Sequence, residues 1–147
     1  YDEAIVESRK LLRTSPQNPG AHQMLSGLLF RKAMYEESLA EMKAYYAGDR
    51  EVEEALTQGY AQSGYSGAMR RAADMLAARS RKTYVPPIDL ATLYAMAGEK
   101  AQALAWLEKG LEVRDGNMPF VNVMSHLETL RNTPRFQDIL RRMNLPR

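Results

Sequence analysis

One spacing recurs three times along this chain and constrains its fold more than any other feature. Three triplets share a four-residue spacing: Leu25, Leu29 and Ala33, then Leu56, Tyr60 and Gly64, then Leu90, Tyr94 and Gly98. Nine residues after the middle members come Ser38, Met69 and Ala103, and four residues later come Met42, Ala73 and Leu107. Recurrent spacing of this kind indicates an internal repeat, in which each unit buries its apolar face against the next.

The repeated units are predicted to be helical. Apolar residues at Leu90, Leu93, Tyr94 and Ala97 follow the periodicity of an amphipathic helix. Capping pairs at 18–19 and 133–134 and glycines at 48, 64, 98 and 116 mark helix ends, and no segment has the pattern of a strand. We therefore expect an all-α chain with helices near 1–14, 19–32, 35–47, 50–63, 66–82, 87–97, 100–114, 118–124, 126–131 and 134–143.

The spacing resembles the tetratricopeptide repeat (TPR), whose motif has a period of about 34 residues. Leu90, Ala91 and Tyr94 match its first helix, and Ala103 and Leu107 match its second. The motif's Trp position is unmatched, because it holds His22, Glu53 and Pro87. The resemblance implies a right-handed superhelix of antiparallel helix pairs. It divides the chain into an array over 1–116 and C-terminal capping helices over 117–147, and the array into a half repeat over 1–18 and repeats near 19–49, 50–83 and 84–116.

Small residues are expected where the two helices of a pair cross, since this is where their backbones approach most closely. Ser26 with Ser38 and Ala91 with Ala103 satisfy this requirement. The middle unit departs from it, with Thr57 and Met69 at the expected crossing and a spacing of 31 residues from the unit before. The packing of this unit is left open by the sequence.

The closing string from Thr133 to Pro146 resembles the C-terminal tails of bacterial TPR proteins, including some that carry a winged-helix or protein-kinase domain upstream. This resemblance implies a region of a larger bacterial protein, and we expect a cytoplasmic location. Cysteine is absent, which excludes disulfides and thiolate sites. No apolar run is long enough for a membrane span, so no membrane association is expected.

No motif for catalysis, metal binding or a cofactor is recognisable. His126 and Glu128 form a His-x-Glu string, but the zinc deaminases that use it also need cysteines. Gly98-Glu99-Lys100 lacks the remainder of a phosphate loop. Both histidines are interpreted as structural, and we expect no enzyme activity, metal or cofactor.

The charge balance, 20 basic against 18 acidic residues, does not favour a nucleic-acid partner. In the TPR resemblance, the first helix of each pair lines a concave groove. The positions that would line it are Gln23, Gly27, Phe30, Arg31, Glu54, Gln58, Gln62, Ile88, Thr92 and Met96. Only Arg31 is cationic, so a clamp for a partner's carboxylates is disfavoured, whereas amides and apolar side chains suit a peptide or an intramolecular segment.

Two functions remain open at this stage. The first is a protein-interaction module that scaffolds or senses by holding a peptide or protein segment in the groove. The second is a structural module that forms homo-oligomers through the N-terminal helix, where Ile5, Leu11 and Leu12 are expected to lack a partner helix. The groove positions are equally compatible with a solvated surface.

Overall fold

The computed structural model describes all 147 residues and contains helices but no strand. This confirms the prediction of an all-α chain. The α-helices are α1 (Asp2–Thr14), α2 (Pro19–Arg31), α3 (Tyr35–Tyr45), α4 (Arg50–Arg79), α5 (Pro87–Met96), α6 (Lys100–Val113) and α7 (Pro134–Arg142), and two 3-10 helices are η1 (Met118–Phe120) and η2 (Ser125–Leu130). No helix combines the length and the apolar character that crossing a bilayer requires.

Helices α2 and α7 begin at the two predicted caps. Asn18 Oδ1 accepts a hydrogen bond from Ala21 N at 3.0 Å, and Thr133 Oγ1 accepts one from Phe136 N at 3.3 Å. Each cap satisfies one of the amide groups that a helix start leaves unpaired, and the proline that follows has no N–H to satisfy. The local sequence therefore fixes where both helices begin.

The third member of each repeated triplet has a positive φ angle. The φ angles are 59° at Ala33, 69° at Gly64 and 82° at Gly98. A left-handed residue lets the chain leave one helix and turn back into the next, and glycine does so without steric cost. The three aligned positions thus share a positive φ angle, although the ψ angle of −156° at Gly64 separates its conformation from the left-handed helical one. After α6 the left-handed residue is Arg114, rather than Gly116 as the sequence suggested.

Helix α4 consists of two arms that fold back on each other. Residues 63–64 have non-helical backbone angles, which separate a first arm (50–62) from a second arm (65–79). The far ends of the two arms meet, because Arg79 donates hydrogen bonds at 2.6 and 3.0 Å to the carboxylate of Asp49. The break agrees with the predicted helix boundary at 63–66.

Glycines allow the close crossing of these two arms. A β-carbon at Gly59 would lie 2.4 Å from the carbonyl oxygen of Gly67, too close for any side chain. The expectation that Thr57 and Met69 occupy this crossing is therefore wrong: Thr57 is exposed and Met69 is buried in the core. The middle unit meets the need for small residues, but at positions shifted from those in the other two units.

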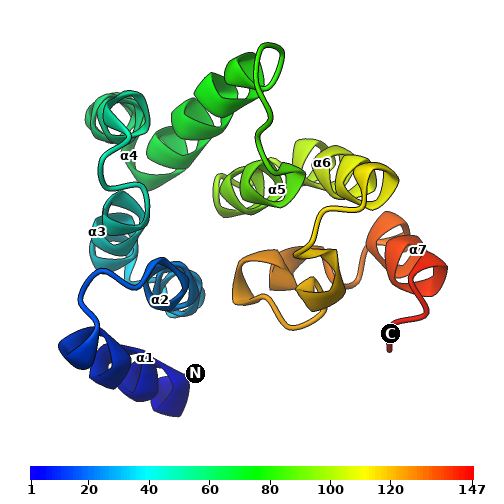
Figure 1. Cartoon of the computed structure of the whole chain (residues 1–147), viewed down its shortest axis with the longest axis horizontal. Helices are drawn as coiled ribbons and strands as arrows, with labels where there is room; N and C mark the ends of the chain where they lie inside the picture. Colours follow the sequence, from blue (N-terminus) through cyan, green and yellow to red (C-terminus); the bar gives the residue numbers. More distant parts are fainter.

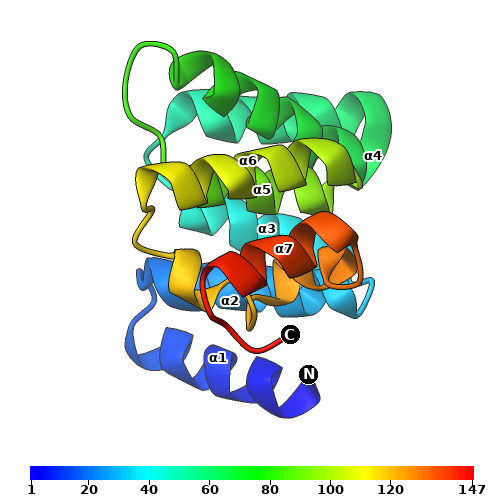
Figure 2. The same ribbon diagram turned by 90° about the vertical axis from the view of Figure 1, so that its right-hand side faces the viewer.

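The helices follow a curve around the C-terminal part of the chain. Figure 1 shows α1 to α6 arranged in an arc, with the segment between α6 and α7 on its inner side. Figure 2 shows the helices lying in stacked rows across the molecule, with α1 at one end and α4 at the other. Helix α2 packs mainly on α3, and α5 mainly on α6.

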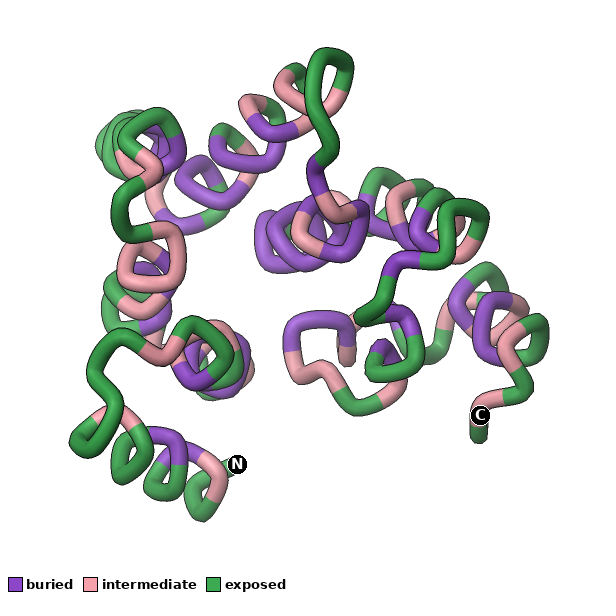
Figure 3. Tube along the Cα trace, in the orientation of Figure 1, coloured by how far each residue is buried: buried purple, intermediate pink, exposed green.

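The interior is formed by one large cluster of buried side chains from α3 to α7 and by a small cluster of Ile5, Leu25, Leu28 and Leu29. Figure 3 shows α5 as mostly buried and α1 as mostly exposed. The predicted helices near 118–124 and 126–131 are the short 3-10 helices η1 and η2, and the first of them ends earlier than expected.

Candidate functional site

The inner side of the arc is occupied by the chain itself. Residues 117–130, which we call the 117–130 segment, lie between α2 and α5 (Figure 1), and η2 packs on both helices. These are the two helices that supply seven of the ten predicted groove positions. The segment therefore takes the place that the sequence offered to a peptide.

Gly27 on α2 is the point of closest approach to the 117–130 segment. A β-carbon at Gly27 would lie 2.5 Å from Ser125 Oγ and 2.7 Å from His126 Cε1. Any larger residue would push the imidazole ring away, so the missing side chain is what lets His126 lie flat against the helix. Glycine in a helix interior costs stability, which is consistent with a packing requirement at this position.

The hydrogen bonds of Ser26 favour one tautomer of the His126 ring. Ser26 Oγ donates to the carbonyl oxygen of Gln23 at 2.7 Å, so it can only accept from His126 Nε2, which lies 3.3 Å away. The proton is therefore on Nε2, and Nδ1 is a buried acceptor without a partner. Burial lowers the pKa of His126 to about 4, against a smaller opposing effect of the Gln23 carbonyl. His126 is neutral at pH 7.

A second contact joins the 117–130 segment to α2 and α1. Arg31 Nε lies 3.5 Å from Glu128 Oε2, and the Tyr1 hydroxyl donates to the same carboxylate. Arg31 is thus already paired within the chain. The one cationic side chain among the predicted groove positions therefore has an ion-pair partner within the chain.

The 117–130 segment is part of the core rather than a loosely attached strap. Met118, Val121, Leu127 and Leu130 are almost completely buried. Burying four such side chains is worth about 6–12 kcal/mol at about 1.5–3 kcal/mol each, which is similar to the whole stability of an average domain. A partner peptide would have to supply this free energy to displace the segment. The segment is therefore packed into the core between α2 and α5.

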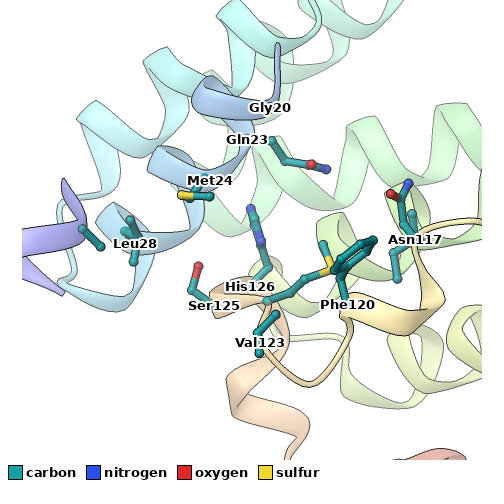
Figure 4. A pocket seen from close by; sticks show the side chains of 12 residues that line it. Gly20, Gln23, Met24, Leu28, Asn117, Phe120, Val123, Ser125 and His126 are labelled. Atoms are coloured by element: carbon teal, nitrogen blue, oxygen red, sulfur yellow. The ribbon is translucent and has the colours of Figure 1, made fainter. Parts of the chain in front are cut away.

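An apolar hollow of about 410 Å³ remains beside the segment, at the N-terminal ends of α2 and α5. Figure 4 shows side chains of α2 and of the 117–130 segment facing each other across it. Three large apolar residues around it are unusually exposed: Met24 at 56%, Phe120 at 58% and Val123 at 78%. We call it the apolar hollow; its lining consists of Ala4, Gly20, Gln23, Met24, Leu28, Ile88, Asn117, Phe120, Val123, Met124, Ser125 and His126.

A second hollow of about 380 Å³ lies at the opposite ends of α2 and α5. Phe30 and Met96 line it, together with Tyr65 and Lys100. Phe30 stacks on Tyr65 with ring centroids 5.8 Å apart, so its ring face is already used inside the protein. This hollow combines an aromatic floor with a cationic side chain.

The groove positions on α4 lie on a different surface. Glu54, Gln58 and Gln62 are exposed, and Arg71 of the second arm donates hydrogen bonds of 2.8 Å to both glutamines. The surface hollows that these residues line have no lining residue outside α4. The two glutamines therefore interact with the other arm of their own helix, and all three residues lie on a surface formed by α4.

The ten predicted groove residues do not form one open groove. Gln23 and Ile88 line the apolar hollow, and Phe30 and Met96 line the second hollow. Gly27 and Thr92 are buried, and Arg31 is paired with Glu128. The 117–130 segment covers the middle of α2 and α5, so the groove candidates on these helices line two separate hollows rather than one surface.

Helix α1 was expected to leave Ile5, Leu11 and Leu12 without a partner helix, and the structure differs from this expectation. Ile5 is buried against Leu25, Leu28 and Leu29, and Leu12 packs on the same cluster, so these two residues do not lack a partner. Leu11 is exposed, as are Tyr1 and Val6, and the outer surface of α1 also carries the ion pair of Glu7 with Lys10. Of the three residues expected to lack a partner helix, only Leu11 is exposed.

His22 and Asp115 have hydrogen-bond partners within the fold, whereas Thr129 Oγ1 and Arg31 Nε are buried without one. His22 Nδ1 lies 2.6 Å from Glu41, and although burial opposes the charged form, bonds to Glu41 and the Pro16 carbonyl raise its pKa. Asp115 accepts hydrogen bonds of 3.0 Å from the backbone N–H groups of Ile88 and Asn117, which ties the 117–130 segment to the start of α5. No group of three or more metal-ligating side chains is present.

Sequence reasoning missed most of the apolar hollow. Met24 was not singled out, and Phe120 and Val123 fall in the range 117–147, for which only capping helices were predicted. One signal was present: Gly27 in the middle of a predicted helix indicates that another part of the chain approaches there.

Comparisons with protein-family models, with curated proteins and with solved structures find no match for this chain.

Proposed function

We propose that this chain is a TPR-type interaction module, a region of a larger bacterial protein, that holds a partner's polypeptide segment at the open end of its concave side. Two observations support a TPR-type array. Ala33, Gly64 and Gly98, aligned by sequence spacing, all have a positive φ angle where one helix or arm ends. Small residues also meet where α2 and α3 pack together, since the Ser38 hydroxyl of α3 donates a hydrogen bond of 2.7 Å to the backbone carbonyl of Ser26 on α2.

The observation that carries the proposed binding function is the exposure around the apolar hollow. Met24 comes from α2, whereas Phe120 and Val123 lie almost a hundred residues later in the chain, yet all three gather at one concave surface. Single exposed apolar residues are ordinary, but a group of them around a hollow is typical of an interaction site. Ser125 and His126 also line the hollow, but no hydrogen bond joins the Ser125 hydroxyl to the imidazole and no metal cluster is present, so binding rather than catalysis is proposed.

Site-specific photo-crosslinking in the source cells tests this function. One variant carries p-benzoylphenylalanine in place of Phe120, and a matched variant carries it in place of Glu112, an exposed residue of α6. We expect a discrete protein adduct from position 120 that the additional substitution Val123→Lys removes. Adducts from position 112 alone, or none from position 120, would contradict the proposal. An adduct between two copies of the chain would instead support self-association.

A further inference from the structure

The lining of the apolar hollow restricts what it can accept. None of the twelve lining residues carries a charge at pH 7, since His126 is neutral. A charged group entering this hollow would lose its hydration and gain no ion pair. The surfaces along α4 differ, because Arg50, Glu53 and Glu54 line one of them and Arg70, Arg71 and Asp74 another. The occupant of the apolar hollow must therefore be uncharged and largely apolar.

Two free carboxamides border the same hollow. Gln23 on α2 is half-buried and Asn117 precedes η1, and neither side-chain amide has a hydrogen-bond partner within the protein. Figure 4 shows the Gln23 side chain extending from α2 towards the Asn117 side of the hollow. A carboxamide offers both a donor and an acceptor, which is the complement of a backbone peptide group.

The combination of an apolar floor and neutral amides at its border matches a polypeptide better than a free apolar molecule. An extended segment presents one side chain towards a surface and peptide N–H and C=O groups on either side of that side chain. A volume of about 410 Å³ is near the lower end of the range of roughly 300–1,000 Å³ that ligand sites occupy. The hollow therefore has room for one or two side chains, not for a folded element.

We infer that the apolar hollow accepts one uncharged aliphatic or aromatic side chain of an extended partner segment, and that Gln23 and Asn117 hold the peptide groups beside it. This inference rests on the proposed interaction function and specifies the partner's chemistry. Affinity for the partner then depends little on salt, since no ion pair forms in the hollow. The second hollow, with Lys100 at its border and Phe30 already stacked on Tyr65, does not share this chemistry.

The nine methionines allow a direct test on the intact chain. Methyl groups labelled with ¹³C at methionine report separately on the apolar hollow through Met24 and Met124, on the second hollow through Met96, and on α7 through Met143. The probe is N-acetyl-L-leucine methylamide, which carries one leucine side chain between two peptide groups. We expect Met24 and Met124 to shift together and to saturate, with a dissociation constant on the order of 1 mM, while Met143 stays unchanged.

Two further probes separate the parts of the inference. N-acetyl-L-lysine methylamide has the same peptide groups with a charged side chain, and we expect no saturable shift. 3-Methyl-1-butanol has the aliphatic group without peptide groups, and we expect it to bind at least about tenfold more weakly. Equal binding of the alcohol and the leucine diamide would overturn the peptide assignment and identify a site for small apolar molecules.

Matched variants locate the contacts. Gln23→Ala and Asn117→Ala each remove one free amide and are expected to weaken the leucine diamide about threefold to tenfold, the usual effect of one hydrogen bond. Gln58→Ala removes an exposed amide on α4 and should leave the affinity unchanged. Unchanged affinity in both of the first two variants would contradict the role of the carboxamides.

The test distinguishes failure of this inference from failure of the proposed function. Absence of a saturable shift at Met24 and Met124 overturns the inference about the hollow, even if crosslinking shows a partner at position 120. Clear binding of the leucine diamide without any protein adduct at position 120 leaves the chemistry of the hollow intact and refutes the interaction function instead.

Discussion

Helix α2 and the first arm of α4 occupy corresponding places in the repeat but have opposite surroundings. Gly27 on α2 is buried beneath His126, whereas Gln58, the position aligned with it on α4, is exposed and bonded to Arg71. The repeat pattern specifies both helices equally well. The difference arises from the 117–130 segment, which lies outside the repeats and covers α2 and α5. The non-repeated part of the chain thus decides which repeat surface remains exposed.

The largest effect is expected from removing a core side chain of the 117–130 segment. Leu127→Ala deletes a completely buried side chain and should lower the free energy of unfolding by about 3 kcal/mol, as leucine truncations in cores do. Urea denaturation followed by circular dichroism measures this change. Val123→Ala in the same segment is the control, with a change within about 0.5 kcal/mol because this residue is exposed. Similar small changes in both variants would show that the segment is not part of the core.

Alanine substitutions at the two aligned positions test the comparison itself. Gly27→Ala places a β-carbon against Ser125 and His126, and we expect the free energy of unfolding to fall by about 2 kcal/mol despite the better helix propensity of alanine. Gln58→Ala should change it by less than about 0.5 kcal/mol. The same denaturation series measures both variants. A stabilised Gly27→Ala variant would mean that His126 does not lie against α2.

Acidification should weaken the covered region through His126. Its pKa is about 4 in the fold against 6.5 in the unfolded chain, so the unfolded chain binds more protons between these values and stability falls as the pH falls. Between pH 7 and pH 5 this contribution amounts to about 2 kcal/mol. The measurement is the free energy of unfolding at both pH values for the wild type and for His126→Gln.

The comparison with His126→Gln is needed because Asp89 changes the free energy of unfolding in the opposite direction as the pH falls. Burial, and to a lesser degree the charge of Asp115, raises the pKa of Asp89 to about 6, so protonation below that pH favours the folded state. Both forms of the protein contain Asp89, and subtracting their pH dependences leaves the contribution of His126. Identical pH dependences would indicate that His126 titrates freely.

The smallest effect concerns the turns of the repeats. Ala33 has a positive φ angle, which Gly64 and Gly98 have without a side chain. Ala33→Gly should therefore raise the free energy of unfolding by about 0.5–1 kcal/mol, and Gly98→Ala should lower it by about 1 kcal/mol. Thermal unfolding of the two variants compares the aligned positions. Destabilisation by Ala33→Gly would argue against the shared positive φ angle.

Much of the fold could be predicted because its signals are local. The structure places helix ends at the caps Asn18 and Thr133 and at Gly64 and Gly98. Each of these signals can be recognised from the residues next to it in the sequence. The crossing of the α4 arms was misplaced because the repeat spacing was extended to Thr57 and Met69. The glycines that make the contact, Gly59 and Gly67, fall outside that spacing.

The candidate site could be predicted only in part, because it depends on contacts between distant parts of the chain. Gln23 and Ile88 were identified from the repeat, and both line the apolar hollow. Phe120 and Val123 reach the same hollow through the path of a non-repeated segment, which no periodicity specifies. Gly27 was placed in the groove. Its contact with His126 joins residues that are almost a hundred positions apart in the sequence, so no local pattern predicts it.

The most direct test of the covered groove is a nuclear Overhauser measurement between His126 and Gly27. The chain contains only two histidines, so their ring protons are simple to assign. The structure predicts a strong cross-peak between the His126 Hε1 proton and the Gly27 α protons, together with a ring that stays neutral down to a pH near 4. Absence of this cross-peak, with a ring that titrates near pH 6.5, would contradict the filling of the groove by the 117–130 segment.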